Sequence, residues 1–152
     1  MKIAEALMLR ADMQKKLLSL RERVGKSAVV QQGDEPHEDP AKLVEESFSI
    51  LQELERLVFR INQANAVTKL ADGRTLTEAI ARRDTLAARH SLLQHAIGSS
   101  HKEPDRYSVS EIKWVATMKV ANLQKQSDDL AKSLRELNAL IQETNWKAEL
   151  PE

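Results

Sequence analysis

The stretch VANLQKQSDDLAKSLRELNALIQETN, residues 120–145, decides the fold of this chain. Two series of residues recur in it every seven positions: Val120, Ser127, Leu134 and Ile141, and then Leu123, Leu130, Leu137 and Thr144. Steps of three and four residues return to the same side of an α-helix, so both series lie on one face. The pattern predicts a long helix over about 120–145, of the coiled-coil type, whose apolar face packs against another helix.

Three further segments show a similar helical spacing of apolar residues. Gly25 favours the end of the first, because glycine adopts the left-handed cap conformation without steric cost. Asp39 and Pro40 favour the start of the second, as an N-cap and a first-turn proline. Thr75 and Glu78 form a capping-box pattern before the third. The helices predicted from these signals run over about 3–24, 40–66 and 75–97.

Four long helices with short connections prefer antiparallel packing. The apolar stripe of the second helix is broad, since Val44, Leu51 and Val58 recur every seven residues and Ile50 and Leu57 add a flank. A stripe of this width suits contact with more than one neighbour. We therefore expect a mainly α protein, an antiparallel four-helix bundle of long helices in a single domain over residues 1–152.

Two short segments have the character of strands. Residues 27–32 contain two adjacent valines, and over residues 110–118 apolar side chains alternate, with Trp114 on one side and Val115 on the other. Alternation with a period of two favours a strand over a helix. A lone strand leaves its backbone groups unpaired, so we expect the two segments to pair as a small two-stranded β ribbon at one end of the bundle.

Composition narrows the class of protein. Lys plus Arg and Asp plus Glu number 23 each, so the net charge is zero, which argues against a nucleic-acid binder and a polybasic membrane-surface protein. The absence of cysteine excludes disulfides, thiolate catalysis and a thiolate zinc site. The sequence shows neither a signal peptide nor an apolar run long enough for a membrane span. We expect a cytoplasmic protein.

Two groups of polar residues could hold a ligand. Asp34, Glu35, His37 and Glu38 offer oxygen and imidazole ligands for a divalent cation, although their spacing fits no EF-hand and an acidic linker before a helix gives the same pattern. Arg83 and His90 fall on the inner face of the third helix, either as a polar pocket, as a polar layer that sets helix register, or at a stripe edge where Arg83 reaches water. We expect no metal and no cofactor.

No motif in the sequence indicates an enzyme. It contains no Gly-rich phosphate loop, no serine nucleophile elbow, and no Glu-x-x-His pair of the kind that holds di-iron centres in bundles. In a chain that is only 3% aromatic, Tyr107 and Trp114 both occur in DRYSVSEIKWVATMKV, residues 105–120. They either close the core or present an edge to which a partner or a second subunit docks.

Several long stretches together resemble a bacterial family of small helical proteins of uncharacterised function, some of which are labelled septicolysin. These stretches are KIAEALMLRADMQKKLLSLRERV, VQQGDEPHEDP, RINQANAVTKLADGRTLTEAIARRD and DRYSVSEIKWVATMKVANLQKQSDDLAKSLRELNALIQETNW. The resemblance implies an oligomeric helical bundle and brings no catalytic residue with it. The label suggests a thiol-activated haemolysin, from which this chain departs in having no cysteine.

Taken together, these features favour a non-enzymatic protein-interaction module that forms a homo-oligomer, with Tyr107 and Trp114 as contact residues. A first alternative is a ligand- or metal-binding bundle with a polar pocket near Arg83 and His90. A second is a septicolysin-like membrane-active toxin.

Overall fold

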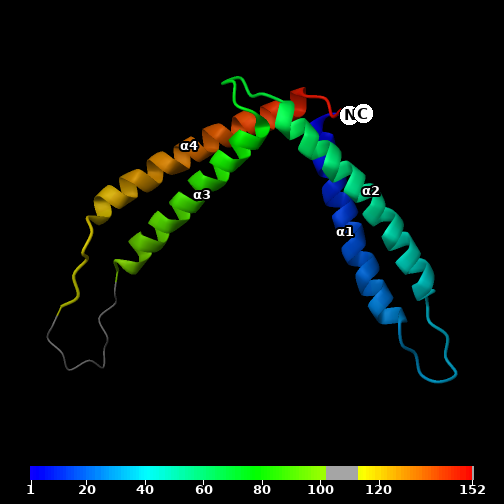
Figure 1. Cartoon of the computed structure of the whole chain (residues 1–152). Helices are drawn as coiled ribbons and strands as arrows, with labels where there is room; N and C mark the ends of the chain where they lie inside the picture. Colours follow the sequence, from blue (N-terminus) through cyan, green and yellow to red (C-terminus); the bar gives the residue numbers. More distant parts are fainter. Residues whose placement is uncertain (102–112, 152) are drawn as a thin grey trace. The chain divides into compact units, whose positions relative to one another are not determined.

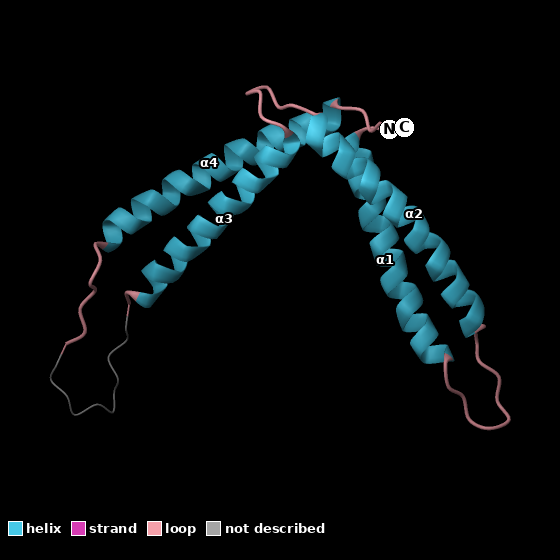
Figure 2. Ribbon diagram, viewed as in Figure 1, coloured by secondary structure: helices cyan, strands magenta, loops and turns pink. Residues whose placement is uncertain are grey.

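The computed structural model describes residues 1–101 and 113–151. Within these ranges the chain forms four α-helices and no β-strand, which confirms the mainly α class (Figures 1 and 2). The chain divides into two compact units, Met1–Lys69 with Gln142–Glu152, and Leu70–Ile141. A four-helix bundle in a single domain stays a prediction. The helices are α1 (Ile3–Ser27), α2 (Pro40–Val67), α3 (Leu76–Ser99) and α4 (Val120–Lys147).

In the first unit α1 and α2 lie side by side as an antiparallel hairpin (Figure 1). Leu20 is fully buried between the helices together with Leu43 and Ile50. Buried and half-buried residues of α1 recur at steps of three and four, the spacing of one helix face. The members of this inner face of α1 are Ile3, Ala6, Arg10, Met13, Leu17, Leu20, Val24 and Ser27.

The start of α2 follows from local chemistry. The Asp39 side chain accepts a hydrogen bond from the Ala41 N–H at 3.0 Å, and Pro40 occupies the first turn, where its missing N–H costs nothing. In the preceding loop Gly33 has a φ of 95°, a left-handed conformation that glycine tolerates. Asp39 and Pro40 therefore start α2 as the sequence predicted.

The two ends of the chain meet within the first unit. The Ile3 N–H donates to the Ala148 carbonyl at 3.1 Å, and the Leu150 N–H donates to the Met1 carbonyl at 2.8 Å. Lys2 and Glu149 form an isolated antiparallel bridge between these bonds. Leu150 is buried, so the C-terminal residues close the core beside the start of α1.

In the second unit α3 packs along α4 (Figure 1). The Gln94 Nε2 of α3 donates to the Ser127 Oγ of α4 at 2.6 Å, and Ser127 is fully buried. Every member of the two seven-residue series predicted for α4 is buried or half-buried. Thr75 caps α3 in a reciprocal box with Glu78, as the sequence predicted.

The predicted end of the first helix at Gly25 is wrong. Helix α1 continues through Gly25 to Ser27. Gly25 is among the glycines without a positive φ, and no atom lies within 4 Å of a Cβ placed on it. A glycine in a solvated last turn weakens a helix but does not stop it when the following residues still bury a side chain, and Ser27 is buried here.

The predicted two-stranded β ribbon is not supported. Residues 28–32 and 113–118 contain no strand, and residues 110–112 of the second segment lie outside the described part of the chain. Val29 is 83% exposed and Val115 is 80% exposed, so neither valine packs as a ribbon residue. In exposed segments water satisfies the backbone groups that a strand partner would otherwise have to satisfy, so alternation alone does not produce a sheet.

Candidate interaction site

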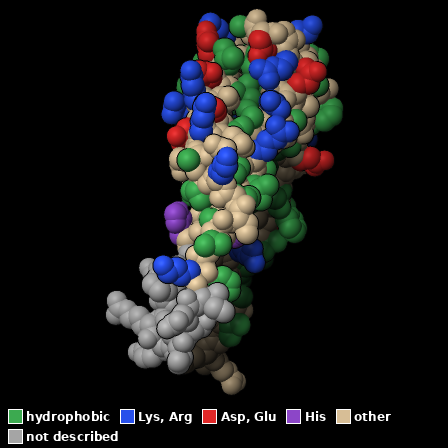
Figure 3. Space-filling model, turned by 90° about the vertical axis from the view of Figure 1, so that its left-hand side faces the viewer, with side chains coloured by type: hydrophobic (Ala, Val, Ile, Leu, Met, Phe, Trp, Pro, Cys, Tyr) green, Lys and Arg blue, Asp and Glu red, His purple; other side chains and the backbone are tan. Residues whose placement is uncertain are grey.

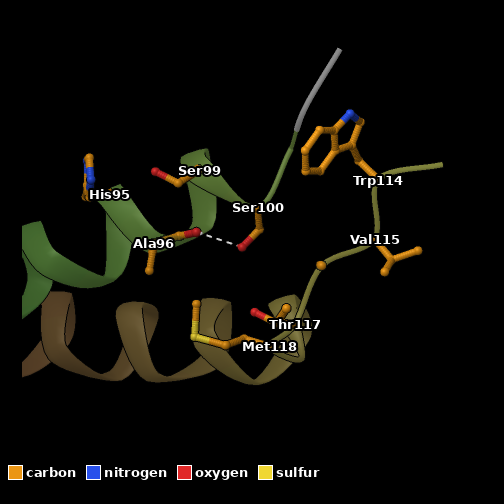
Figure 4. A pocket seen from close by; sticks show the side chains of 9 residues that line it. His95, Ala96, Ser99, Ser100, Trp114, Val115, Thr117 and Met118 are labelled. Carbon is orange, nitrogen blue, oxygen red and sulfur yellow. Dashed lines mark hydrogen bonds between the residues drawn. The ribbon is translucent and has the colours of Figure 1, made fainter. Parts of the chain in front are cut away.

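A cavity lies at the C-terminal end of α3, against the segment that precedes α4 (Figure 4). Its volume is about 460 Å³. From α3 and its C-cap come His95, Ala96, Ser99 and Ser100, and from the other segment come residues 114–118. In Figure 4 the Trp114 ring lies on the side of the α3 end, whereas Val115 points away.

The chemistry of this cavity is mainly apolar. The Ser100 Oγ donates to the Ala96 carbonyl at 2.7 Å, so this hydroxyl is engaged by the end of its own helix. Among the described residues that line the cavity, none is acidic. His95 therefore has no carboxylate beside it in this lining, and the cavity offers an indole ring, a thioether and methyl groups for contact.

Large aromatic side chains of this chain lie at its surface. Both phenylalanines and both tryptophans are more than half exposed: Phe48 by 66%, Phe59 by 61%, Trp114 by 73% and Trp146 by 54%. Such residues usually dominate cores, and they are enriched in protein–protein interfaces. Figure 3 shows one face on which hydrophobic side chains reach the surface between charged ones.

Two further hollows accompany these exposed residues. A groove of about 420 Å³ runs between α3 and α4 and is lined by Arg89, Leu92, Asp129 and neighbours, with Leu92 68% exposed. A shallow hollow of about 520 Å³ lies on α2 beside Phe48 and Leu51. Both are surfaces suited to the side chains of a partner.

Arg83 and His90 occupy the inner face of α3 and are half-buried. The Arg83 Nε donates to the Asp84 Oδ1 at 2.9 Å, and this ion pair lies at the surface. The cavity at Trp114 and the groove at Leu92 are both lined by other residues. Arg83 thus pairs with its sequence neighbour Asp84, and neither Arg83 nor His90 lines the cavity or the groove.

Part of the acidic segment before α2 is held by contacts with α1 and with the preceding loop. Glu38 forms an ion pair with Arg23, and the hydrogen bond from this guanidinium lowers the pKa of the Glu38 carboxyl. The Asp34 N–H donates to the Gln31 carbonyl at 3.0 Å in a turn. Glu35 and His37 are exposed. Over residues 1–101 and 113–151, no three His, Asp or Glu side chains are gathered as a metal site would require.

The remaining interaction candidate, Tyr107, lies outside the described residues. The exposure of Phe48 and Leu51 differs from the prediction. The sequence pattern placed Leu51 at the centre of the apolar stripe of α2 and Ile50 at its flank, but Ile50 is buried and Leu51 is 47% exposed. The signal in the sequence was that α2 carries two apolar series at adjacent positions, which indicates a second apolar face on this helix.

Three comparisons with known proteins bear on this chain. The model of a family of unknown function, DUF6847, matches residues 10–150. A solved structure described as a functionally unknown conserved protein from Corynebacterium diphtheriae is similar, with 38% sequence identity, 99% of each chain covered and a TM-score of 0.93. No curated protein sequence matches. Neither description carries the septicolysin label.

In the part of the chain that the structure describes, no helix has both the length and the apolar character to cross a bilayer.

Proposed function

We propose that this chain, which belongs to the DUF6847 family of unknown function, is a non-enzymatic protein-interaction module that associates with further copies of itself. The observation that carries the proposal is the exposure of both phenylalanines and both tryptophans. When a partner covers side chains of this size, the removal of their apolar surface from water stabilises the complex.

The exposed aromatic residues are additional to the faces that hold each unit together. The inner face of α1 packs on Leu43 and Ile50 of α2, and the inner face of α4 reaches Gln94 of α3 through Ser127. Phe48 and Trp114 belong to neither inner face. Exposed aromatic side chains are enriched in the surfaces through which proteins associate.

The cavity at Trp114 supports a binding role. It places an indole ring and a thioether beside the end of α3, where they offer apolar contact to a bound group. The cytoplasmic location expected for a cysteine-free chain is part of the same proposal.

Light scattering coupled to size-exclusion chromatography tests the proposal. At tens of micromolar we expect a mass of at least twice the 17.2 kDa of one chain. Dilution should lower the mass towards that of one chain, because association depends on concentration. A strict monomer over the whole range would contradict the proposal.

Ligand binding is a second candidate function, and the cavity at Trp114 favours it at that position. A Trp146→Phe variant leaves Trp114 as the single tryptophan, whose fluorescence reports on the cavity. Titration with anilinonaphthalene sulfonate should quench this emission if the cavity takes an apolar aromatic ligand. A Trp114→Phe variant, in which Trp146 reports instead, is the matched control.

The septicolysin resemblance leaves membrane activity as a third candidate. Dye release from phosphatidylcholine–phosphatidylglycerol vesicles measures it directly. Release at micromolar protein would favour the toxin over the interaction module.

A further inference from the structure

The two sides of the α1–α2 hairpin differ in chemistry. On one side Lys16 of α1 pairs with Glu46 of α2, with Nζ and Oε1 2.7 Å apart. Each of these residues directly precedes an inner-face position, Leu17 and Ser47. In an antiparallel helix pair, the residues that precede inner positions on both helices share one side of the hairpin, and those that follow them share the other.

The residues that follow inner positions are mostly apolar. Six of them form what we call the apolar face: Leu7, Leu18, Val44, Phe48, Leu51 and Val58. Leu18 is 61% exposed, Phe48 66% and Leu51 47%. The hollow on α2 is part of this surface, since Phe48 and Leu51 line it. The apolar face is therefore a second face, in addition to the one that joins α1 to α2.

The charges on this side are few and are placed in a regular way. Among the residues that follow inner positions from Ile3 to Ile61, the charged ones are Arg21 and Glu55. Neither takes part in an ion pair within the described residues, and they have opposite signs.

The Lys16–Glu46 ion pair on the other side shows which residues of α1 and α2 lie level with one another, at the same height along the hairpin. Since Lys16 is level with Glu46, Arg21 is level with about residue 41 of α2. Glu55 then lies about 14 residues away, or about 20 Å at a rise of about 1.5 Å per residue. Phe48 lies midway between the two levels. The apolar face thus has a positive end, a negative end and an aromatic centre.

We propose that the apolar face binds the same face of a second copy of the chain, about a two-fold axis near Phe48. Such an axis brings the Arg21 end of one copy onto the Glu55 end of the other, twice, and places the two Phe48 side chains at the centre. A face that complements itself in this way is the requirement of a two-fold interface. The inference rests on the proposed self-association and names its surface.

The size of the apolar face agrees with a stable dimer. Helix α1 has 25 residues, so it is about 38 Å long, and two adjacent helices are about 20 Å wide. This gives a footprint of about 750 Å² for one whole side of the hairpin, comparable with the roughly 800 Å² per partner of specific interfaces. Two stacked hairpins would also supply four helices from two chains, which accounts for the broad apolar stripe of α2.

Charge reversal tests the pairing of the two ends. In Arg21→Glu two glutamates would meet at each end, and in Glu55→Arg two arginines would meet, so sedimentation velocity should show weaker dimers for each variant, by about tenfold in Kd. An equimolar mixture of the two variants restores opposite charges at both ends and should recover the dimer. Arg56→Glu, an exposed reversal on the other side of α2, should leave Kd unchanged.

The outcomes separate this inference from the proposed function. A wild-type chain that stays monomeric overturns both. A wild-type dimer whose Kd is unchanged in both variants, or whose loss in them is not rescued by mixing, leaves self-association standing and overturns this face. Both positions are exposed, so the variants should fold, and far-ultraviolet circular dichroism verifies their helix content. If either loses helix, Arg21→Gln and Glu55→Gln replace them, with a weaker dimer expected for each.

Discussion

The Nζ of Lys16 lies 2.7 Å from the Oε1 of Glu46 and joins α1 to α2 on one side of their hairpin. An exposed pair of this kind contributes little stability. The pair instead gives the register of the hairpin: it shows which residues of α1 and α2 lie at the same height, and that this side of the hairpin carries charged residues. The apolar face lies on the opposite side, where Leu18, Phe48 and Leu51 are exposed.

Leu20 should carry much of the stability of the first unit. Its side chain is fully buried against Leu43 and Ile50, so Leu20→Ala leaves a cavity and should lower the free energy of unfolding by about 2–5 kcal/mol. Leu9→Ala makes the same change on the same helix at a position that is 45% exposed, and should cost less than about 1 kcal/mol. Urea denaturation followed by circular dichroism measures both. Equal losses would contradict the placement of the inner face.

Two glycines should respond in opposite directions to alanine. Gly73 has a φ of 87°, where a side chain is strained, so Gly73→Ala should lower the free energy of unfolding by about 1 kcal/mol. Gly25 is helical and has open space around it, so Gly25→Ala should raise it by about 0.5–1 kcal/mol. Thermal melts of both variants give the signs. Destabilisation by Gly25→Ala would show that α1 ends earlier than described.

The hydrogen bond between Gln94 and Ser127 should couple α3 to α4. Ser127 is fully buried at a position of the seven-residue pattern that otherwise holds apolar residues. Ser127→Ala leaves the Gln94 amide without this partner, and a double-mutant cycle with Gln94→Ala should give a coupling of about 1 kcal/mol. Denaturant unfolding of the four proteins measures the cycle. Strictly additive losses would mean that the bond does not contribute.

Glu149 should make the junction of the chain ends sensitive to acid. The hydrogen bond from Lys2, and then that from the N-terminal amino group, hold the pKa of Glu149 below its ordinary value of 4.5. A lowered pKa in the folded state stabilises the fold above the ordinary value, and this contribution disappears as the pH falls through the lowered one.

Glu149→Gln should therefore melt below the wild type at about pH 7, and the two melting temperatures should converge as the pH falls below 4.5, the ordinary pKa of the carboxyl. Glu53→Gln is the control, since Glu53 takes part in no ion pair within the described residues. A gap between wild type and Glu149→Gln that persists at acid pH would assign the effect to something other than this carboxylate.

The helices could be predicted from the sequence because each carries its own signals. Asp39 and Thr75 cap helices as expected, and the series from Val120 to Thr144 is buried or half-buried throughout. These are local properties, set by spacing within one helix and by hydrogen bonds within one turn.

What could not be predicted depends on neighbours. Ile50 and Leu51 are equally apolar, and only the position of α1 decides that Ile50 is buried and Leu51 is exposed. In the same way, the alternation around Trp114 needs a paired strand before it becomes a sheet, and no local signal supplies one. The candidate site was therefore predicted at Trp114 but not at Phe48.

Cross-linking through Gln14 tests the central claim, that two copies meet through the apolar face, most directly. Gln14 follows the inner-face residue Met13 and, by the register of Lys16 and Glu46, is level with Phe48. The chain has no cysteine, so Gln14→Cys introduces a single thiol, and bismaleimidoethane should convert this variant into a covalent dimer on a reducing gel. Ser19→Cys places the same thiol on the charged side and should stay monomeric. Equal cross-linking of both variants, or of neither, would contradict the account.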